Sequence, residues 1–463
     1  MTNNPLRNIP SVNELLDKPS LKQLVDKVSH NVVVSEVRSF LDNLRSDVQQ
    51  KTSEMRVPTA SELADKIAQW IVSDQRPRLR PVINATGVLL HTGLGRSPLA
   101  EEALQEALAV ASGYSSLEVD LESGERSQRN QSVERLLIEL TSGEAAFVVN
   151  NNAGATLLTL AALAGGKEVV VSRGHLVEIG GSYRLPDVME ASGARLREVG
   201  TTNKTRLSDY ERAVGEMTGA LLRVHPSNYV IRGFTEQASL AELIELGQRV
   251  DVPVIDDIGS GALTDLAPLG LTDEPMARDS LRAGADVVLF SGDKLLGGPQ
   301  CGIAVGKRKY IERLMKHPLA RALRVDKLTL AALHATLKLY RDPAQAMARV
   351  PLLALASTSL ENLTNRAQRL APQLEACAAI ASAEVIEDTA CLGGGSVPTQ
   401  ELPTRCIALR PVDGSVNQLA QALRTGQHAV FGRIQQDRLL LDLRTVFPKQ
   451  DAELIEAVQA LSR

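Results

Sequence analysis

The chain has 463 residues, a length that suits roughly three domains, and 44% of them are hydrophobic. No apolar run approaches the ~20 residues of a membrane span, and the first residues lack the pattern of a signal peptide. The net charge of −4 and the 3% aromatic content argue against a globally basic or base-stacking nucleic-acid binder. We therefore expect a cytoplasmic globular protein that makes no membrane contact.

The four cysteines do not suggest a metal or redox site. They have no Cys-x-x-Cys spacing, which argues against a zinc ribbon or a redox pair. They are Cys301, Cys377, Cys391 and Cys406. We interpret Cys301 as a small core residue at the start of a strand.

Residues 1–75 predict a small helical module. Apolar residues recur at helical spacing, and Ser61 is the expected N-cap of a helix that runs through Trp70. Up to Arg76 the segment carries ten basic and ten acidic residues, so composition alone does not identify an RNA-binding module. Arg76, Arg78 and Arg80, separated by prolines, predict a semi-rigid basic linker.

Residues 76–342 predict an α/β core, and residues 343–463 a smaller α+β domain. In the core, helical stretches such as 239–249 alternate with apolar strands, the pattern of a mostly parallel sheet covered by helices. The clearest strands are 169–172, 220–224, 252–255, 287–290 and 303–305. The last domain has a helix near 360–377, strands near 405–409 and 438–443, and a closing helix from Asp451.

A candidate phosphate-binding turn follows the apolar run 145–149. Residues 150–158 read as a turn of small residues that leads into a helix. Free backbone N–H groups at a helix start bind phosphate, and Ala153, Gly154 and Ala155 allow an anion to approach closely.

A candidate acid follows the strand at 252–255. Asp256 and Asp257 stand at its end, and Asp257 precedes Lys294 by 37 residues. A pyridoxal phosphate (PLP) site needs a carboxylate near the pyridine nitrogen, because a protonated ring withdraws electrons. Both aspartates are candidates, and an ordinary strand-terminal turn is the alternative.

Lys294 is the candidate cofactor lysine. The strand 286–290 ends in Ser291, Gly292 and Asp293, and sites of open α/β sheets lie beyond the carboxyl ends of strands. A partly desolvated lysine amine becomes neutral and suits bonding to the PLP aldehyde. A surface lysine is the alternative. Phosphate turn, acid and lysine each follow an apolar run, and together they favour a PLP enzyme.

Several long and unusual runs resemble the bacterial selenocysteine synthase family, the L-seryl-tRNA(Sec) selenium transferases, which are fold-type I PLP enzymes. The runs extend over most of the core. They are Asn84-Ala-Thr-Gly-Val-Leu-Leu-His-Thr, Leu94-Gly-Arg96, Val149-Asn-Asn-Asn152, Val170-Val-Ser-Arg-Gly174, Val177-Glu-Ile-Gly-Gly181, Glu198-Val-Gly-Thr-Thr-Asn203, residues 291–300 and Arg321-Ala-Leu-Arg324.

The resemblance implies roles for individual residues. The cofactor lysine matches Lys294, and the ring-nitrogen acid matches Asp257 better than Asp256. Phosphate and selenium-donor contacts match Asp293, Arg96, Arg321 and Arg324. Ser291, Ala153, Gly154 and Ala155 complete the expected cofactor contacts.

Two residues depart from the family pattern. Gly93 stands where the family usually has Asn, which weakens any expectation of a side-chain contact there. His175 stands where Glu is expected. His175 is a candidate for stacking on the cofactor ring, and a surface or capping histidine is the alternative.

The resemblance implies conversion of seryl-tRNA(Sec) to selenocysteinyl-tRNA(Sec) with selenophosphate, by β-elimination of the serine hydroxyl and addition of selenium. An esterified substrate needs no arginine fork for a free carboxylate, which leaves arginines for an oxyanion. Arg321 and Arg324 are three residues apart, so on a helix they would face one side. Solvated arginines near a helix start are the alternative.

Two rival functions follow from the same residues. The first is a PLP-dependent lyase or transferase for a small free amino acid, with Arg444 as its carboxylate fork. The second is a catalytically silent tRNA-binding protein, which the combination of lysine, acid and phosphate turn disfavours. The family resemblance further implies a homo-oligomer built from dimers, such as a decameric ring, and a tRNA-binding role for residues 1–75.

Overall fold

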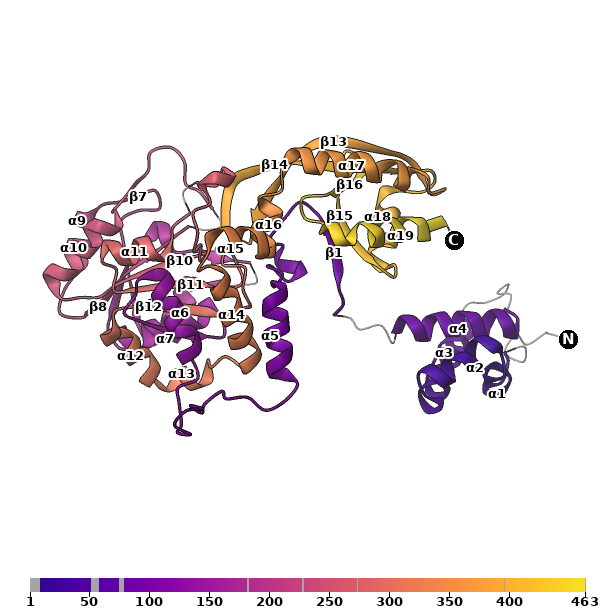
Figure 1. Cartoon of the computed structure of the whole chain (residues 1–463), viewed down its shortest axis with the longest axis horizontal. Coiled ribbons are helices and arrows are strands. Elements are labelled where there is room, and N and C mark those ends of the chain that lie inside the picture. The colour runs from indigo at the N-terminus through magenta and orange to yellow at the C-terminus, as the bar shows by residue number, and fades with distance from the viewer. Residues whose placement is uncertain are drawn as a thin grey trace. The chain divides into compact units, whose positions relative to one another are not determined.

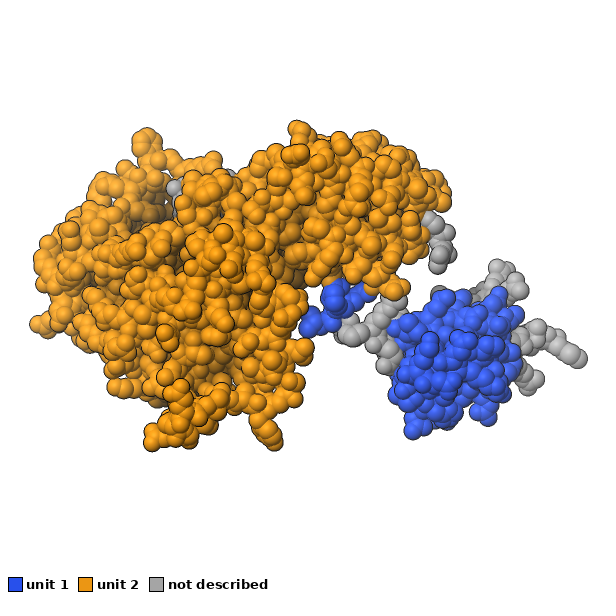
Figure 2. All heavy atoms as spheres, in the orientation of Figure 1, with its two compact units in different colours: residues 1–81 blue, residues 82–463 orange. Residues whose placement is uncertain are grey.

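The structure is a computed structural model that describes residues 9–50, 58–74, 79–180, 183–226, 229–272, 274–394 and 396–462. The chain divides into two compact units, residues 1–81 and residues 82–463 (Figure 2). Among the described helices, none combines the length and the apolar character that crossing a membrane requires. Arg76 and Arg78 of the expected linker lie outside the described residues.

The first unit is helical, as predicted. Apolar side chains spaced three and four residues apart close a core between its helices, with Leu15, Leu41 and Ile67 fully buried. Phe40 and Trp70 pack with their ring centroids 5.9 Å apart. The helices are α1 (Val12–Leu16), α2 (Pro19–Lys27), α3 (His30–Gln50) and α4 (Ala60–Asp74) (Figure 1).

The predicted cap of α4 is wrong by two residues. Thr59, not Ser61, precedes the helix, and its hydroxyl accepts a hydrogen bond from the Glu62 N–H at 3.3 Å. The Glu62 carboxylate in turn accepts from the Thr59 N–H at 2.8 Å. This reciprocal capping box needs a Glu three residues after the cap, and Thr59 is the residue with that spacing.

The second unit contains a seven-stranded sheet in the order β2-β12-β11-β10-β8-β3-β6. Neighbouring strands of this sheet pair in parallel, except that β12 is antiparallel to both β11 and β2. The predicted, mostly parallel sheet is therefore confirmed. The strands are β2 (Ala145–Val149), β3 (Glu168–Ser172), β6 (Arg195–Val199), β8 (Thr218–Val224), β10 (Val254–Gly259), β11 (Val287–Ser291) and β12 (Gly302–Gly306).

Helices cover both faces of this sheet (Figure 1). Successive strand residues point to opposite faces, so Val288 packs on one side and Leu289 on the other. The face with Val288 packs against α5 (Glu101–Ala111), α6 (Gln131–Thr141), α10 (Leu240–Val250), α11 (Ala277–Ala283) and α14 (Lys327–Leu339). The face with Leu289 packs against α7 (Asn152–Ala164), α8 (Leu185–Ala191), α12 (Arg308–Lys316) and α13 (Pro318–Ala322).

A second sheet has the order β1-β15-β16-β14-β13 and packs against α17 (Leu360–Glu375), α18 (Val416–Thr425) and α19 (Asp451–Gln459). Its strands are β1 (Val82–Ala85), β13 (Ile380–Gly393), β14 (Ser396–Pro411), β15 (Ala429–Gln435) and β16 (Arg438–Asp442). The strand β1 pairs in parallel with β15 although some 350 residues of sequence separate them. The early segment 82–85 is therefore part of the late sheet.

The chain passes between the two sheets through α15 (Pro343–Arg349) and α16 (Pro351–Ala356). Both helices bury apolar side chains in the core cluster of the seven-stranded sheet, for example Ala346 and Leu353. Two short ribbons complete the unit. They are β4 (Glu178–Ile179) with β5 (Tyr183–Arg184), and β7 (Lys204–Thr205) with β9 (Glu236–Gln237), while α9 (Leu207–Ala213) contributes Tyr210 to the core.

Candidate active site

Lys294 lies in a tight turn that follows β11. The Gly292 N–H donates to the Cys301 carbonyl at 2.9 Å, and the Gly298 N–H donates to the Gly292 carbonyl at 2.8 Å. A Cβ at Gly292 would lie 2.4 Å from Cys301 Sγ, so this close approach requires glycine. Cys301 is buried just before β12, as predicted. The turn holds Lys294 at the carboxyl edge of the sheet with only 5% of its surface exposed.

The surroundings of Lys294 favour its neutral amine. Burial is the largest cause that lowers the pKa of Lys294, and the charge of Arg96 lowers it further. The carboxylates of Asp257 and Asp293 act in the opposite direction but do not reverse the shift. Arg96 Nη1 donates to Asp293 Oδ2 at 2.7 Å, which partly neutralises one of these acids. The structure thus brings Lys294, Asp257, Asp293 and Arg96 into one electrostatic group.

Asp257 is buried on the α7 face of β10. Its Oδ1 accepts from Asn152 Nδ2 at 3.0 Å and from the Gly259 N–H at 3.1 Å, and its Oδ2 accepts from Thr156 Oγ1 at 3.0 Å. Burial raises the pKa of Asp257, although these hydrogen bonds and the charge of Lys294 oppose the shift. The carboxylate is held by these hydrogen bonds, and no described arginine or lysine forms an ion pair with it, so it can bind a cationic group of a ligand.

Asp256 points to the opposite face of the sheet, because adjacent strand residues alternate. Its Oδ1 accepts from Arg223 Nη1 at 2.9 Å, and its Oδ2 accepts from Ser280 Oγ at 2.7 Å. Asp256 is therefore neutralised by a cation of the protein itself. Of the two aspartates, the geometry favours Asp257 as the acid beside Lys294.

The start of α7 lies next to Asp257. The Asn151 side chain accepts from the Gly154 N–H at 2.7 Å, and the Asn151 carbonyl accepts from the Ala155 N–H at 3.0 Å. These two amides are therefore used within the protein. In the described part of the chain, the N–H groups of Asn152 and Ala153 have no partner, so they are the donors that remain for an anion.

His175 is buried at the carboxyl end of β3, so the alternative of a surface histidine is wrong. Burial lowers its pKa to about 4, with a further contribution from the charge of Arg223. A hydrogen bond with Gln237 acts in the opposite direction. Within the described residues, no hydrogen bond or ion pair joins His175 to Lys294 or Asp257. The charged residue that acts on His175 is Arg223, which pairs with Asp256 on the face of the sheet opposite to Asp257.

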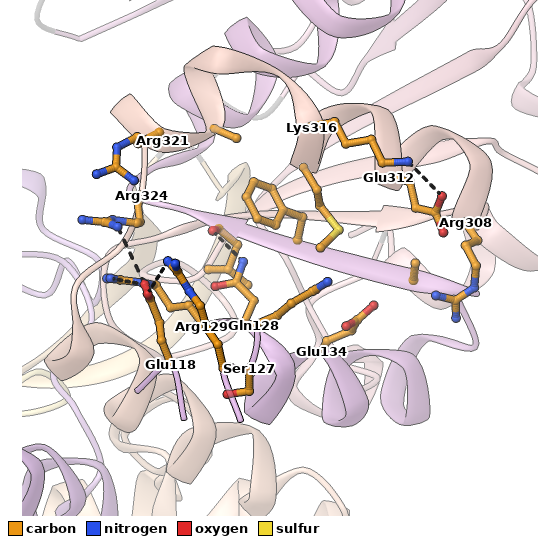
Figure 3. Close-up of a pocket in the computed structure, with 17 residues that line it drawn as sticks. Glu118, Ser127, Gln128, Arg129, Glu134, Arg308, Glu312, Lys316, Arg321 and Arg324 are labelled. Carbon is orange, nitrogen blue, oxygen red and sulfur yellow. Dashed lines mark hydrogen bonds and ion pairs between the residues drawn. The ribbon is translucent and has the colours of Figure 1, made fainter. Parts of the chain in front are cut away.

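Arg321 and Arg324 line one cavity of about 650 Å³ (Figure 3). The expectation that both lie on one helix is wrong, because α13 ends at Ala322. Arg324 instead forms an isolated antiparallel bridge with Val149, which places it beside the end of β2. Of the described residues that line this cavity, none is Lys294, Asp257 or Asp293. The structure thus places the predicted arginines in two groups, with Arg96 at Lys294 and the other two in this cavity.

Arg444 does not form an exposed carboxylate fork. Its side chain is buried, and it donates to backbone carbonyls at the end of α16 and in β14. The accepting carbonyls are those of Leu355, Ala356, Thr358 and Pro403. Arg444 thus joins two parts of the fold, and its guanidinium is occupied by the protein.

Several residues near the site were not predicted. Asn152 and Thr156 hold Asp257, and Tyr183 lies close enough for the charge of Asp257 to contribute to a raised pKa of its hydroxyl. Glu274 accepts from Ser260 Oγ at 2.5 Å, and its charge acts on Lys294. The polar run 150–152 was a visible signal for Asn152. Glu274 stands in an irregular loop, where no periodicity marks it.

The fold and the site together define a fold-type I PLP-dependent enzyme, with a lysine beyond a strand end, an acid on the neighbouring strand and a helix start for the phosphate. A solved structure of D-glucosaminate-6-phosphate ammonia-lyase has a similar fold. It superposes with a TM-score of 0.58 at 21% identity, covering 86% of this chain and 98% of that chain.

The chain belongs to the L-seryl-tRNA selenium transferase family, whose family model matches residues 82–447. A second model, for the N-terminal part of selenocysteine synthase, matches residues 6–45. L-seryl-tRNA(Sec) selenium transferase of Alkaliphilus metalliredigens is 47% identical, covering 99% of this chain and 99% of the relative. The protein of that name from Moorella thermoacetica is 49% identical, covering 99% and 97%.

The residues present fit pyridoxal 5′-phosphate, the cofactor of this enzyme. Lys294 supplies a buried amine whose pKa is lowered, and Asp257 supplies a carboxylate for the ring nitrogen. At the start of α7, a Cβ on Gly154 would lie 3.2 Å from both Asn150 Oδ1 and Leu323 Cδ2, so glycine keeps the turn open. The Oδ1 atom of Asn152 is buried there without a partner in the described structure.

Asp257→Asn is expected to retain the bound cofactor but to reduce turnover by about 10³-fold or more, because the ring nitrogen loses its charge partner. The matched control is Asp256→Asn, which should leave turnover largely intact, since its carboxylate serves Arg223 and Ser280. Turnover and cofactor absorbance are measured on both variants. Near-normal turnover in Asp257→Asn, or a collapse confined to Asp256→Asn, would show that the wrong acid was chosen.

Proposed function

We propose that this enzyme converts seryl-tRNA(Sec) to selenocysteinyl-tRNA(Sec), replacing the serine hydroxyl by selenium. The observation that carries the proposal is the group of buried Lys294, Asp257 and Asp293 with the partly exposed Arg96, found in a chain that aligns almost end to end with L-seryl-tRNA(Sec) selenium transferases. We place the enzyme in the cytoplasm, where aminoacyl-tRNA is used.

Lys294 would bind the aldehyde of the cofactor, and Asp257 would bind its ring nitrogen. The start of α7 and Ser291 would bind its phosphate group. When bound, the cofactor withdraws electrons from the substrate Cα. Once the substrate amine occupies the cofactor aldehyde, Lys294 would be free to take the Cα proton, because its lowered pKa favours the neutral base. The serine hydroxyl would take up a proton and leave Cβ as water. Selenium of selenophosphate would add to Cβ while Lys294 returns the proton to Cα, and water would cleave the Se–P bond to release phosphate. Asp293 keeps Arg96 beside this centre.

Selenophosphate is the proposed selenium donor, and Arg96, Arg321 and Arg324 are its proposed ligands. A planar guanidinium binds a tetrahedral oxyanion through paired, charge-assisted hydrogen bonds. Arg321 and Arg324 are exposed and share a cavity, which supports a common ligand. Arg96 is held by Asp293 next to Lys294, so it is the proposed donor ligand that lies beside the reacting carbon.

A PLP enzyme for a free amino acid is the competing function, and the environment of Arg444 weighs against it. Such an enzyme needs a guanidinium open to the substrate carboxylate. The guanidinium of Arg444 is already held by backbone carbonyls, among them Ala356 at 2.9 Å. His175 remains a proposed ring contact only if it turns from Gln237 toward the cofactor.

A second copy of the chain would complete the site in a homo-oligomer built from dimers, which we propose to form a ring such as a decamer. Two features support this. The cavity of Arg321 and Arg324 is lined by none of the described cofactor residues, so a partner's centre can face it. Leu104 and Leu108 on α5, followed by Tyr114, expose apolar surface of the kind that oligomer contacts cover.

Incubation of the purified protein with seryl-tRNA(Sec) and selenophosphate is expected to yield selenocysteine on the tRNA, identified by mass spectrometry after deacylation. Arg324→Ala and Arg321→Ala should abolish this transfer while leaving the spectral change on adding seryl-tRNA(Sec) intact, because only the donor step needs an oxyanion site. Arg→Lys should recover little, since it loses the planar fork. Loss of the spectral change in Arg324→Ala would contradict the donor role.

We further propose that residues 1–75 bind the tRNA, residues 76–342 form the catalytic core and residues 343–463 a supporting domain, except that β1 pairs in the sheet of the supporting domain and α15 and α16 pack in the core. The helical unit has its own apolar core, which supports a separable module. Deleting residues 1–75 should spare cofactor binding but reduce seryl-tRNA(Sec) conversion by at least 100-fold, a loss of ~3 kcal/mol in transition-state binding. A truncated protein that binds and converts seryl-tRNA(Sec) normally would refute the assignment.

A further inference from the structure

The carboxylate of Glu118 gathers three arginines at one end of the cavity. Its Oε1 accepts from Arg129 Nη2 at 2.8 Å and from Arg129 Nε at 3.2 Å. Its Oε2 accepts from Arg126 Nη2 at 3.1 Å, while Arg324 Nη1 lies 3.7 Å from Oε1. Figure 3 shows Glu118 between Arg324 and Arg129. A carboxylate of the protein thus defines where these guanidinium groups lie.

Arg129 connects Glu118 to the backbone beside Arg324. Its Nη1 donates to the carbonyl of Val325, the next residue along the chain, at 2.8 Å. On the other side, Arg324 bridges to Val149 of β2. The short segment that carries Arg324 is therefore held from both sides. Arg129 itself is well covered, with 17% of its side chain exposed compared with 43% for Arg324.

The two arginine contacts of Glu118 differ in strength. The Arg129 contact is charge-assisted, its Nε and Nη2 atoms both donate to Glu118 Oε1, and the Arg129 side chain is largely covered, so this is the stronger of the two contacts. The Arg324 contact is longer than a hydrogen bond and exposed, and pairs of this kind contribute little. Glu118 therefore fixes Arg129 firmly and leaves the Arg324 guanidinium available to a ligand.

The local charge at this end of the cavity favours an anion. Arg126, Arg129 and Arg324 share the single carboxylate of Glu118, and Arg321 adds a fourth guanidinium to the lining. In the described part of the chain, Arg321 has no carboxylate partner. Positive charge therefore remains in excess after the protein's own ion pairs are formed, and a donor with two or more negative charges offsets it.

We propose that Glu118 is a positioning residue for the selenium donor, acting through Arg129 to hold Arg324 beside Arg321 in the geometry that receives the donor oxyanion. The inference rests on the proposed function, because it takes the donor arginines as given. The inference adds that the Glu118 carboxylate strengthens donor binding although it lies next to an anion site. The gain in donor affinity from positioning Arg324 is larger than the loss from charge repulsion between Glu118 and the donor.

Glu118→Gln tests the inference in the holoenzyme. The KM for selenophosphate should rise about tenfold, as expected when a charge-assisted clamp is lost, while kcat at saturating donor and the cofactor spectrum stay unchanged. Arg129→Lys should have the same effect, because a lysine ammonium lacks the planar, spread donors with which Arg129 reaches Glu118 and the Val325 carbonyl at once. The double variant should resemble either single variant, since the two residues act as one unit.

Glu134→Gln is the matched control. Glu134 lies on α6 and lines the same cavity away from the arginine cluster, so the substitution removes the same charge without touching the clamp (Figure 3). Its KM should stay within about twofold of the wild-type value if geometry matters more than net charge. A KM in Glu118→Gln that is unchanged or lowered, or one that Glu134→Gln reproduces, would overturn the positioning role.

Phosphate binding separates this inference from the proposed function. Inorganic phosphate is titrated into the holoenzyme and its binding is followed by calorimetry, a readout that needs no turnover. Arg321→Ala, Arg324→Ala and Glu118→Gln should all weaken binding. If the two arginine variants bind phosphate normally, the donor site itself is wrong. If they weaken binding and Glu118→Gln does not, only the positioning role fails.

Discussion

The hydrogen bonds from Asn152 and Thr156 to Asp257 are the interaction on which the site depends. They join the start of α7 to the end of β10, and so link the place for the cofactor phosphate to the place for its ring nitrogen. Each hydrogen bond to a charged group contributes about 1.5–3 kcal/mol, whereas burial of an unpaired charge costs several kcal/mol. Burial raises the pKa of Asp257, and these hydrogen bonds together with the charge of Lys294 oppose that shift, so they are what supports the carboxylate as an anion.

The rest of the site follows from the alternation of side chains along the strands. Asp257 faces α7 and stays available, whereas Asp256 faces the other side and is neutralised by Arg223. The strand β11 ends at Ser291, and the glycine-rich turn that follows places Lys294 at the carboxyl edge of the sheet. Glu118 and Asp293 show a second common theme. Asp293 holds Arg96, which is proposed to contact the donor, and Glu118 holds Arg129, which supports the segment of Arg324. In both cases a carboxylate near the proposed anion site orders an arginine.

Much of this arrangement could be predicted from the sequence, because strand, turn and small-residue patterns are local. The strand before Lys294 and the turn after β2 appear where they were expected, whereas the strand predicted at 252–255 is β10, Val254–Gly259, and contains both Asp256 and Asp257. Contacts between distant segments could not be predicted. Arg324 pairs with Val149 and does not share a helix face with Arg321. Arg444 is buried and donates to backbone carbonyls, so it does not form the fork considered for a free carboxylate. Capping also misled, since Thr59 and Ser61 are both acceptable caps and only the partner Glu62 decides between them.

The central claim is that Lys294 binds the cofactor at the end of β11. The most direct measurement is to reduce the holoenzyme with borohydride, digest it and locate the pyridoxyl group by mass spectrometry. The account predicts a yellow protein and a single modified peptide that contains Lys294, with Lys294→Ala giving no labelled peptide. A modification that maps to a different lysine, or labelling that persists in Lys294→Ala, would contradict it.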